Sequence, residues 1–398
     1  MRCDVCHHPG NNVGFDSRGF LYKVSSLPAP NQQQSTTPAA ACSNAPAVMP
    51  RWNEPVGRND HRQQQQEQQQ QHLAGLWGSH VSTGAEEAKG SSAVASSTPV
   101  FQDDLDLDML HSLKLFAQGG FCAVYSCVYL NEKAVLKIPK SQGPERAVAD
   151  LLVEISIYRR LAERGGHANI TRAFGAGFHL VEGKSTPFLV LELLEGGSLA
   201  AAIERSRPQG DDAGFEEWID PVPRLPAALE LADAMHFLHF EAVPSGFVLH
   251  RDLKPTNIGL CSEGHVKVFD LGLSVIQEVR EGNMDKKYEM PGMAGSKRFM
   301  SPEVCNGLPY NEKVDVYSFA IVLWELCSLR KPFQGMSVAD HFREVITGGL
   351  RPPLDPRWPA ELQHLLQACW HEDPDQRPSF LEAREVLRRI LWTVHGGG

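Results

Sequence analysis

His250-Arg251-Asp252-Leu253-Lys254-Pro255-Thr256-Asn257 is the most informative stretch of this 398-residue chain, and Asp270-Leu271-Gly272 follows thirteen residues after its last member. Ala134-Val135-Leu136-Lys137 lies upstream, and Ser301-Pro302-Glu303 lies downstream. Phosphoryl transfer explains why these residue types occur together. Lys and metal-binding Asp and Asn side chains neutralise the transferring group, and a carboxylate orients the attacking hydroxyl and accepts its proton.

The hydrophobic pattern changes from strand-like to helical along the chain. The β-like runs are Leu113–Phe116, Ala123–Tyr129, Lys133–Ile138 and Phe188–Leu193, with one helical segment, Ala147–Ala162, among them. The later helical patterns are Leu225–Phe240, Val314–Ser328, Ala339–Thr347, Glu361–Trp370 and Phe380–Trp392. A β-rich region before a helix-rich one predicts an α+β protein with two lobes.

The ordered set of motifs closely resembles the signature of the eukaryotic protein kinase family, from about Leu110 to Leu391. The resemblance implies a bilobal protein kinase fold, with a small β-rich N-lobe that carries one helix and a large helical C-lobe. We expect the kinase domain at 108–391, with the N-lobe at about 108–194 and the C-lobe at about 195–391. ATP would lie at the junction of the lobes.

The resemblance also implies a role for each charged motif residue. Asp252 would be the catalytic base, and Lys254 would contact the γ-phosphate. Lys137 would hold the α- and β-phosphates of ATP, with Glu154 as its ion-pair partner.

The implied cofactors are ATP and Mg²⁺. Asn257 and Asp270 would bind Mg²⁺, Leu191 would be the gatekeeper of the adenine pocket, and the backbone of Glu192–Leu194 would hydrogen-bond adenine. The remaining predicted ATP contacts are Ala117, Gly119, Phe121, Val124 and Val135.

Other family positions have structural roles by resemblance. Glu303 and Arg377 match a structural ion pair of the family. Asp315 would anchor the catalytic loop from a buried helix.

Two stretches indicate the branch of the family. Gly295–Glu303 and Cys369–Phe380 both resemble the tyrosine-kinase-like group, whereas Lys254-Pro255 is typical of Ser/Thr kinases and not of true tyrosine kinases. We therefore expect a Ser/Thr kinase of the tyrosine-kinase-like group.

The glycine-rich loop departs from the family pattern. G-x-G-x-x-G-x-V falls on Ala117–Val124, where only the middle glycine, Gly119, is kept. Since glycines let the backbone approach the phosphates, we expect altered nucleotide binding but not its loss. Cys122, at the third glycine position, is either a redox-sensitive thiol that gates ATP binding or a small packed hydrophobe.

Further departures lie in the C-lobe. Leu271 replaces the phenylalanine of the Asp-Phe-Gly motif and is a reasonable hydrophobic plug. Gly259 should loosen packing under adenine unless neighbours fill the gap. The segment between Asp270 and Glu303 holds few phosphate acceptors, so we expect little control by a Ser/Thr phosphosite, with Tyr288 as the mid-loop candidate.

Composition limits the remaining function classes. Lys+Arg is 38 and Asp+Glu is 48, and the net charge of −10 argues against nucleic-acid binding. The longest apolar run, near Phe319–Trp324, is far short of the roughly 20 residues of a membrane span. The start of the chain has no apolar segment typical of a signal peptide. Nine scattered cysteines favour a reducing compartment, so we expect a cytoplasmic or nuclear protein.

The first 100 residues differ in composition from the rest of the chain. Val24–Val100 has few apolar residues and contains the glutamine runs Gln63–Gln66 and Gln68–Gln71, so we expect residues 1–100 to be a disordered tail. It is either a spacer or a segment that binds a protein partner. Cys3–His7 matches half a zinc site, but no second cysteine pair follows nearby, so adventitious metal affinity is the simpler interpretation.

The leading functional hypothesis is an active protein kinase that acts on Ser/Thr of protein substrates in intracellular signalling. The alternative is a pseudokinase that serves as an ATP-binding or scaffold module, supported by the altered glycine loop and Gly259. A third interpretation, tyrosine or dual specificity, is disfavoured by Lys254.

Overall fold

The computed structural model describes residues 13–15, 21–23, 101–118, 121–140, 145–181, 184–207, 224–278, 286–290 and 295–394. The chain divides into two units, Met1–His61 and Arg62–Gly398. In the first unit, β1 (Val13–Phe15) pairs antiparallel with β2 (Leu21–Lys23). The rest of residues 1–100, including the glutamine runs and Cys3–His7, lies outside the described residues, so the expected disorder stays a prediction.

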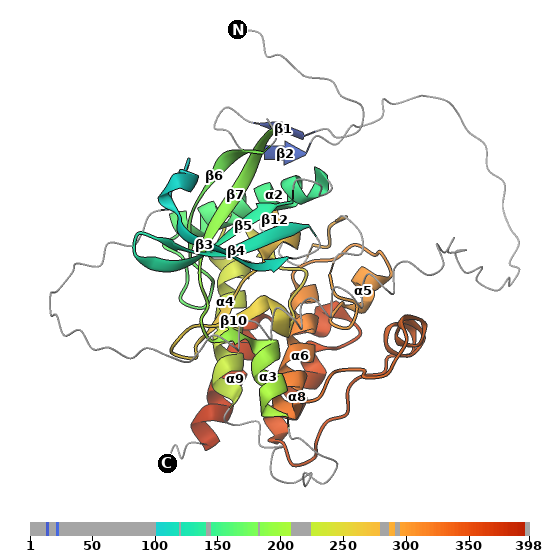
Figure 1. Ribbon diagram of the computed structural model, residues 1–398. Helices are drawn as coiled ribbons and strands as arrows, with labels where there is room; N and C mark the ends of the chain where they lie inside the picture. The colour runs from blue at the N-terminus through green and yellow to red at the C-terminus, as the bar shows by residue number, and fades with distance from the viewer. Residues whose placement is uncertain are drawn as a thin grey trace, which may run out of the picture. The chain divides into compact units, whose positions relative to one another are not determined.

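The N-lobe of the second unit is a five-stranded antiparallel sheet with one helix against it (Figure 1). The strand order is β3-β4-β5-β7-β6. The strands are β3 (His111–Gln118), β4 (Cys122–Tyr129), β5 (Glu132–Pro139), β6 (Ala173–Val181) and β7 (Lys184–Glu192). Ahead of them lies a short 3-10 turn, η1 (Leu107–Met109).

The N-lobe helix is α2 (Glu145–Glu163). Its buried apolar side chains include Leu151, Ile155 and Tyr158, which recur at i, i+4 and i+7 and therefore form one face. This face joins the same buried cluster as Leu189 and Leu191 of β7. Burial of the helix against the sheet fixes the side chains that α2 directs toward β5.

The C-lobe is mainly helical. Its helices are α3 (Leu199–Ser206), α4 (Leu225–Phe240), α5 (Pro302–Cys305), α6 (Lys313–Ser328), α7 (Val338–His341), α8 (Ala360–Cys369) and α9 (Phe380–Val394). A π-helical turn, η5 (Phe342–Thr347), continues α7, and 3-10 turns occur at η3 (Pro255–Asn257), η4 (Leu271–Leu273) and η6 (Pro374–Gln376). The short strands are β8 (Gly197–Ser198), β9 (Gly246–Leu249), β10 (Ile258–Leu260), β11 (Val266–Val268) and β12 (Val275–Glu278).

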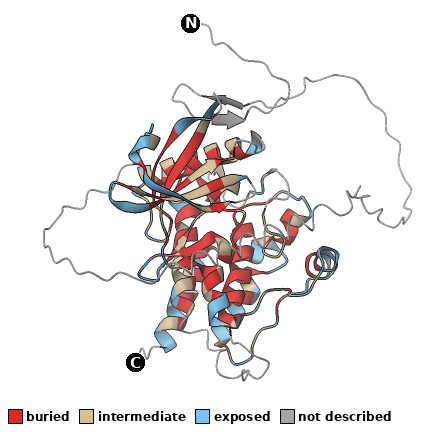
Figure 2. Ribbon diagram, in the orientation of Figure 1, coloured by how far each residue is buried: buried red, intermediate tan, exposed pale blue. Residues whose placement is uncertain are grey.

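Helix α6 forms the centre of the C-lobe. Every residue from Val314 to Cys327 is buried, as expected of a helix that is surrounded by others. Figure 2 shows buried residues concentrated between the helices, with exposed ones on their outer faces. The buried catalytic-loop segment after β9 packs beside this helix.

The predicted fold class is confirmed: a β-rich N-lobe with one helix precedes a helical C-lobe. Each predicted strand and helix from Leu113–Phe116 to Phe380–Trp392 has a counterpart, although Ala339–Thr347 divides into α7 and η5. Strand β6 and helix α3 were not predicted. Among the described residues, no helix is long and apolar enough to cross a bilayer.

Candidate active site

Lys137 stands where the two lobes meet. It lies on β5, opposite Val124 of β4 and Leu189 of β7. Its Nζ is 2.7 Å from Oε2 of Glu154 on α2 and 2.7 Å from Oδ1 of Asp270 in the C-lobe. Three positions that are far apart in the sequence therefore meet at one ammonium group.

The charges of this cluster stabilise one another. The positive charge of Lys137 lowers the pKa of Asp270 to about 2. Burial alone would lower the pKa of Lys137, but the Asp270 and Glu154 carboxylates raise it well above its ordinary value. The Glu154 side chain is only 1% exposed, so it holds Lys137 from the protein interior.

The catalytic loop begins after β9 and is held by Asp315 of α6. The Asp315 carboxylate accepts the backbone N–H of His250 at 2.8 Å and that of Arg251 at 2.9 Å. His239 of α4 contacts the same carboxylate at 3.0 Å. Arg251 takes a left-handed backbone conformation (φ +66°), which these hydrogen bonds hold in place. The predicted anchoring role of Asp315 is confirmed.

Asp252 is surrounded by donors that fix both of its carboxylate oxygens. Oδ2 accepts from Lys254 Nζ at 2.7 Å and from Asn257 Nδ2 at 3.1 Å. Oδ1 accepts from the backbone N–H of Ser296 at 2.8 Å, and the Ser296 hydroxyl accepts from Lys254 Nζ at 2.8 Å. The carboxylate is thus oriented, and a cation lies beside it.

The Ser296 contact depends on Gly295. This glycine has φ +114°, and an added Cβ would overlap the carbonyl oxygen of Arg251. Only glycine therefore allows the segment before Ser301 to approach the catalytic loop this closely.

Asp270 and Asn257 offer oxygen ligands, which suit Mg²⁺. Asp270 follows β11 in a left-handed conformation (φ +63°), and its side chain is 41% exposed although Oδ1 contacts Lys137. Mg²⁺ in phosphoryl-transfer sites is held by one or two carboxylates together with substrate phosphates. The two residues fit that donor set.

Most of the nucleotide positions predicted from the sequence lie on the strands around Lys137. Val135 of β5 pairs with Leu191 of β7, and Ala117 of β3 pairs with Val124 of β4. Phe121 is exposed just before β4, and Gly119 lies outside the described residues.

The end of β7 and the residue that follows it are tied to both lobes. The Glu192 carboxylate accepts from Lys267 Nζ of β11 at 2.6 Å and from the backbone N–H of Arg172 at 2.6 Å. The backbone N–H of Leu193 donates to the carbonyl of Lys133 at 3.2 Å. The predicted adenine-binding backbone is therefore held in a defined conformation.

Comparison with known proteins places this geometry in a family. The model of the protein tyrosine and serine/threonine kinase family matches residues 110–387, more than two thirds of the chain. This chain belongs to that family. The match confirms the kinase resemblance that the motifs gave.

Individual relatives of this chain are named as protein kinases. The kinase is 32% identical over 275 residues to a probable serine/threonine-protein kinase of Dictyostelium discoideum, covering 69% of this chain and 27% of that protein. It is 32% identical over 300 residues to the serine/threonine/tyrosine-protein kinase HT1 of Arabidopsis thaliana (73% and 69%). It is 29% identical over 297 residues to human mitogen-activated protein kinase kinase kinase 7 (73% and 43%). These relatives agree with the tyrosine-kinase-like assignment, and the chain spans less than half the length of the first and third.

The structure explains how the kinase tolerates Gly259. A Cβ at this position would overlap Cδ1 of Leu194, so the Leu194 side chain already fills the space that a larger residue would occupy. Leu194 is buried. The expected loosening under adenine is therefore offset by a neighbour.

Cys122 pairs with Pro139 across β4 and β5. Burial raises the pKa of its thiol to about 11, so the thiol is protonated at neutral pH. Because the thiolate is the reactive form, this environment supports the packed-side-chain interpretation.

Tyr288 is docked against the C-lobe. It exchanges backbone hydrogen bonds with Tyr310 at 2.9 and 3.1 Å, and its ring packs edge-on against Phe247. Within the described residues its phenol oxygen is buried without a hydrogen-bond partner. Phosphorylation of Tyr288 would therefore require this segment to leave the C-lobe.

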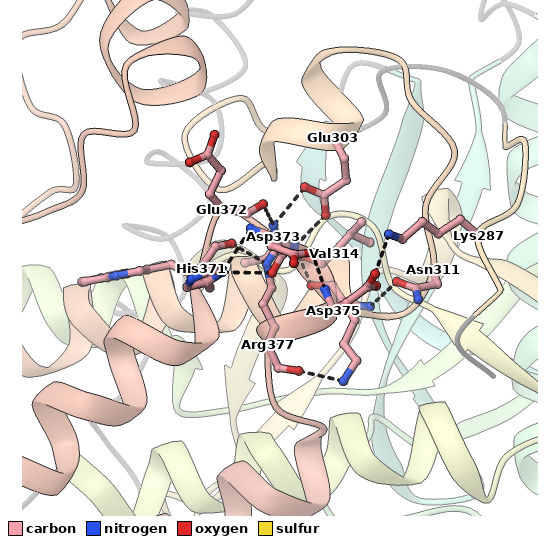
Figure 3. A network of polar contacts seen from close by, with 12 residues as sticks. Lys287, Glu303, Asn311, Val314, His371, Glu372, Asp373, Asp375 and Arg377 are labelled. Carbon is pink, nitrogen blue, oxygen red and sulfur yellow. Dashed lines mark hydrogen bonds and ion pairs between the residues drawn. The ribbon is translucent and has the colours of Figure 1, made fainter.

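Arg377 is the centre of a buried polar network in the C-lobe (Figure 3). It binds both oxygens of Glu303, at 2.6 and 3.0 Å, and donates to the carbonyls of His371 and Lys313. The predicted structural ion pair is confirmed. This pair joins α5, at the end of the segment that runs from Asp270 to Glu303, to the residues between α8 and α9.

Proposed function

We propose that this kinase transfers the γ-phosphoryl group of ATP to Ser or Thr hydroxyls of proteins in intracellular signalling. The observation that carries the proposal is the meeting of Lys137 with Glu154 and Asp270, both at 2.7 Å. A protein kinase needs this lysine and this aspartate in place to position phosphates and metal.

Asp252 is the group that we assign to the substrate hydroxyl. Its carboxylate orients the hydroxyl and accepts the proton as the oxygen attacks phosphorus. The bonds to Ser296, Asn257 and Lys254 fix the direction of this carboxylate. Lys254 lies next to it and supplies positive charge toward the transferring group.

Lys137 supplies positive charge toward the α- and β-phosphates. Glu154 keeps the ammonium group on the side of the sheet that faces Asp270. Asp270 and Asn257 would hold Mg²⁺, which neutralises phosphate charge when bound. Leu191 and the backbone of Glu192–Leu194 would bind adenine.

The pseudokinase alternative is not favoured. Its support was the altered glycine loop and Gly259, and Leu194 fills the space at Gly259. The charged residues that transfer requires are all present. Lys137 contacts Glu154 and Asp270, and Asp252 contacts Lys254. We also propose a cytoplasmic or nuclear location, which the six free cysteines of the described residues support.

The test is transfer of ³²P from ATP with Mg²⁺ to a generic protein substrate, followed by analysis of the phosphorylated amino acids. We expect phosphoserine or phosphothreonine. Phosphotyrosine as the main product would contradict the Ser/Thr assignment. Absence of labelled product at every ATP concentration would contradict the proposed activity.

A further inference from the structure

The segment before β3, residues 101–110, is bound along the outer edge of the N-lobe sheet. The family match begins only at residue 110, so most of this segment lies ahead of the shared domain. Gln102 N donates to the Phe174 carbonyl at 2.9 Å, and Ala176 N donates to the Gln102 carbonyl at 3.0 Å. Leu105 N adds a bond to the Ala176 carbonyl at 2.9 Å. The segment therefore covers β6, which would otherwise be an open edge.

Two glycines of β6 make room for this segment. A Cβ at Gly175 would overlap the backbone of Gln102, and a Cβ at Gly177 would overlap the carbonyl of Leu105. The strand register also shifts between Ala173 and Gly175, where Gln102 pairs. The sequence of β6 is thus fitted to the segment.

The other side of the segment contacts α2. Asp103 Oδ1 accepts from Arg159 Nη2 at 2.7 Å and from Arg159 Nε at 2.8 Å. The same guanidinium lies 5.7 Å from the ring centre of Phe101. Phe101 is 8% exposed and belongs to the buried cluster that contains Leu151 and Ile155 of α2.

The relative strength of these contacts can be ordered. Asp103 and Arg159 are partly exposed, and exposed ion pairs contribute little to stability. Burial of the Phe101 ring removes a large apolar surface from water, so it should contribute most of the free energy that binds the 101–110 segment to α2. Asp103 then fixes the direction of Arg159.

Helix α2 carries both Arg159 and Glu154. They are five positions apart, which is about 7.5 Å along a helix axis. A helix moves as a unit, so contacts that hold Arg159 also hold Glu154 relative to β5. We propose that Phe101 and Asp103 are positioning residues, which keep α2 where Glu154 binds Lys137. This inference rests on the proposed function, because the pair positions ATP.

The experiment uses the full chain with three variants: Phe101→Ala, Asp103→Ala and, as a matched control, Asp108→Ala. Asp108 lies in the same segment and is exposed. We would measure hydrogen exchange of the α2 amides, together with kcat and KM for ATP. Asp103 is on the surface, so its variant should fold even if Phe101→Ala does not.

We expect faster exchange in α2 and a kcat/KM for ATP that is lower by roughly 5- to 30-fold in Phe101→Ala, with a smaller loss in Asp103→Ala. The Asp108→Ala control should have the exchange rates in α2 and the kcat/KM of the wild type. The charge swap Asp103→Arg with Arg159→Asp should recover part of the Asp103→Ala loss, because the pair is rebuilt.

Unchanged exchange in α2 would overturn the inference, as would lower thermal stability with an unchanged kcat/KM. If the wild type transfers no phosphate, the proposed function fails by itself. Hydrogen exchange still decides the inference in that case: faster exchange supports positioning of α2, and unchanged exchange contradicts it.

Discussion

The Lys137 ammonium group contacts one carboxylate from each lobe. The Glu154 carboxylate is buried. Glu154 contributes a charged hydrogen bond from the interior, whereas Asp270 is partly exposed at the site itself. A substitution at Glu154 therefore tests the buried contact while the side chain of the predicted metal ligand, Asp270, stays in place.

Glu154→Gln keeps the shape of the side chain but removes its charge. Hydrogen bonds to charged groups are worth about 1.5–3 kcal/mol, so kcat/KM for ATP should fall by roughly 10- to 100-fold. Steady-state kinetics measure this. Glu163→Gln, an exposed change at the end of α2, is the control and should have little effect. Equal kinetics in both variants would contradict the role assigned to Glu154.

The packing of Leu194 against Gly259 gives a second prediction. Gly259→Leu forces two side chains into one space, and overpacking costs about 1–3 kcal/mol. We expect lower thermal stability and weaker ATP binding, measured by melting curves with and without ATP. The double variant Gly259→Leu with Leu194→Ala should recover part of both losses. A single variant that behaves like the wild type would show that Leu194 does not fill this space.

The sequence predicted the charged residues of the site because motif spacing identifies them. It could not predict which neighbouring side chains and strands surround the departures from the family pattern. The sequence indicated a gap at Gly259 because the position of Leu194 depends on the fold. It indicated Tyr288 as a candidate phosphosite because the pairing of Tyr288 with Tyr310 joins residues that are distant in the sequence. The raised pKa of the Cys122 thiol likewise follows from its partial burial in the fold.

Strand β6 shows why one element was missed. Ala173–Val181 contains Gly175 and Gly177, and glycine inside a strand weakens the strand pattern. Both glycines admit the segment at 101–110, a contact that no local pattern reveals. Strands β4 and β5 were predictable because each is a run of strand-forming residues, and they pair with each other across a short turn.

The end of α6 carries a buried carboxylate. Glu325 lies 3.2 Å from Arg207, which also pairs with Glu204. Burial raises the pKa of Glu325 to about 7, although Arg207 opposes the shift. The folded state therefore retains a proton that the unfolded chain, with a pKa near 4.5, releases.

This shift predicts a pH dependence of stability. The contribution of Glu325 to the free energy of unfolding is fully present below about pH 4.5. It is lost as the pH rises through about 7, because between these two pH values the folded state binds more protons than the unfolded chain. Glu325→Gln lacks this effect. Relative to the wild type, its free energy of unfolding should rise by roughly 2–3 kcal/mol between pH 4.5 and 8.

Urea denaturation across that pH range is the measurement, with Glu204→Gln as a control that contacts the same arginine. The free energy of unfolding of the control should change with pH nearly as it does in the wild type. A constant difference between Glu325→Gln and the wild type over the whole range would refute the prediction.

The stability of the C-lobe depends on contacts between distant segments. Arg377 and Glu303 are both buried, and they join residues that are 74 positions apart. Removing one partner leaves the other charge buried and unpaired. Arg377→Ala should therefore lower the free energy of unfolding by about 3–5 kcal/mol.

Denaturant unfolding would measure this loss. Arg388→Ala removes an exposed arginine that pairs with Asp233 and Glu385, and its cost should stay below about 1 kcal/mol. Similar costs for the two variants would show that the buried pair does not hold the lobe together.

The whole chain could be predicted only in part. The bilobal kinase fold follows from the order of strands, helices and motifs, because these patterns are local. The domain limits of 108–391 and the role of residues 1–100 remain predictions. The segment at 101–110 shows that residues ahead of the family match contribute to the N-lobe.

The most direct test of catalysis compares the wild type with Asp252→Asn and Asp108→Asn in phosphoryl transfer from ATP with Mg²⁺. Loss of the base should lower the rate by roughly 10²–10⁴-fold, whereas the exposed Asp108 control should keep the wild-type rate. That result would establish transfer by the site around Asp252. Equal rates in all three proteins would contradict it.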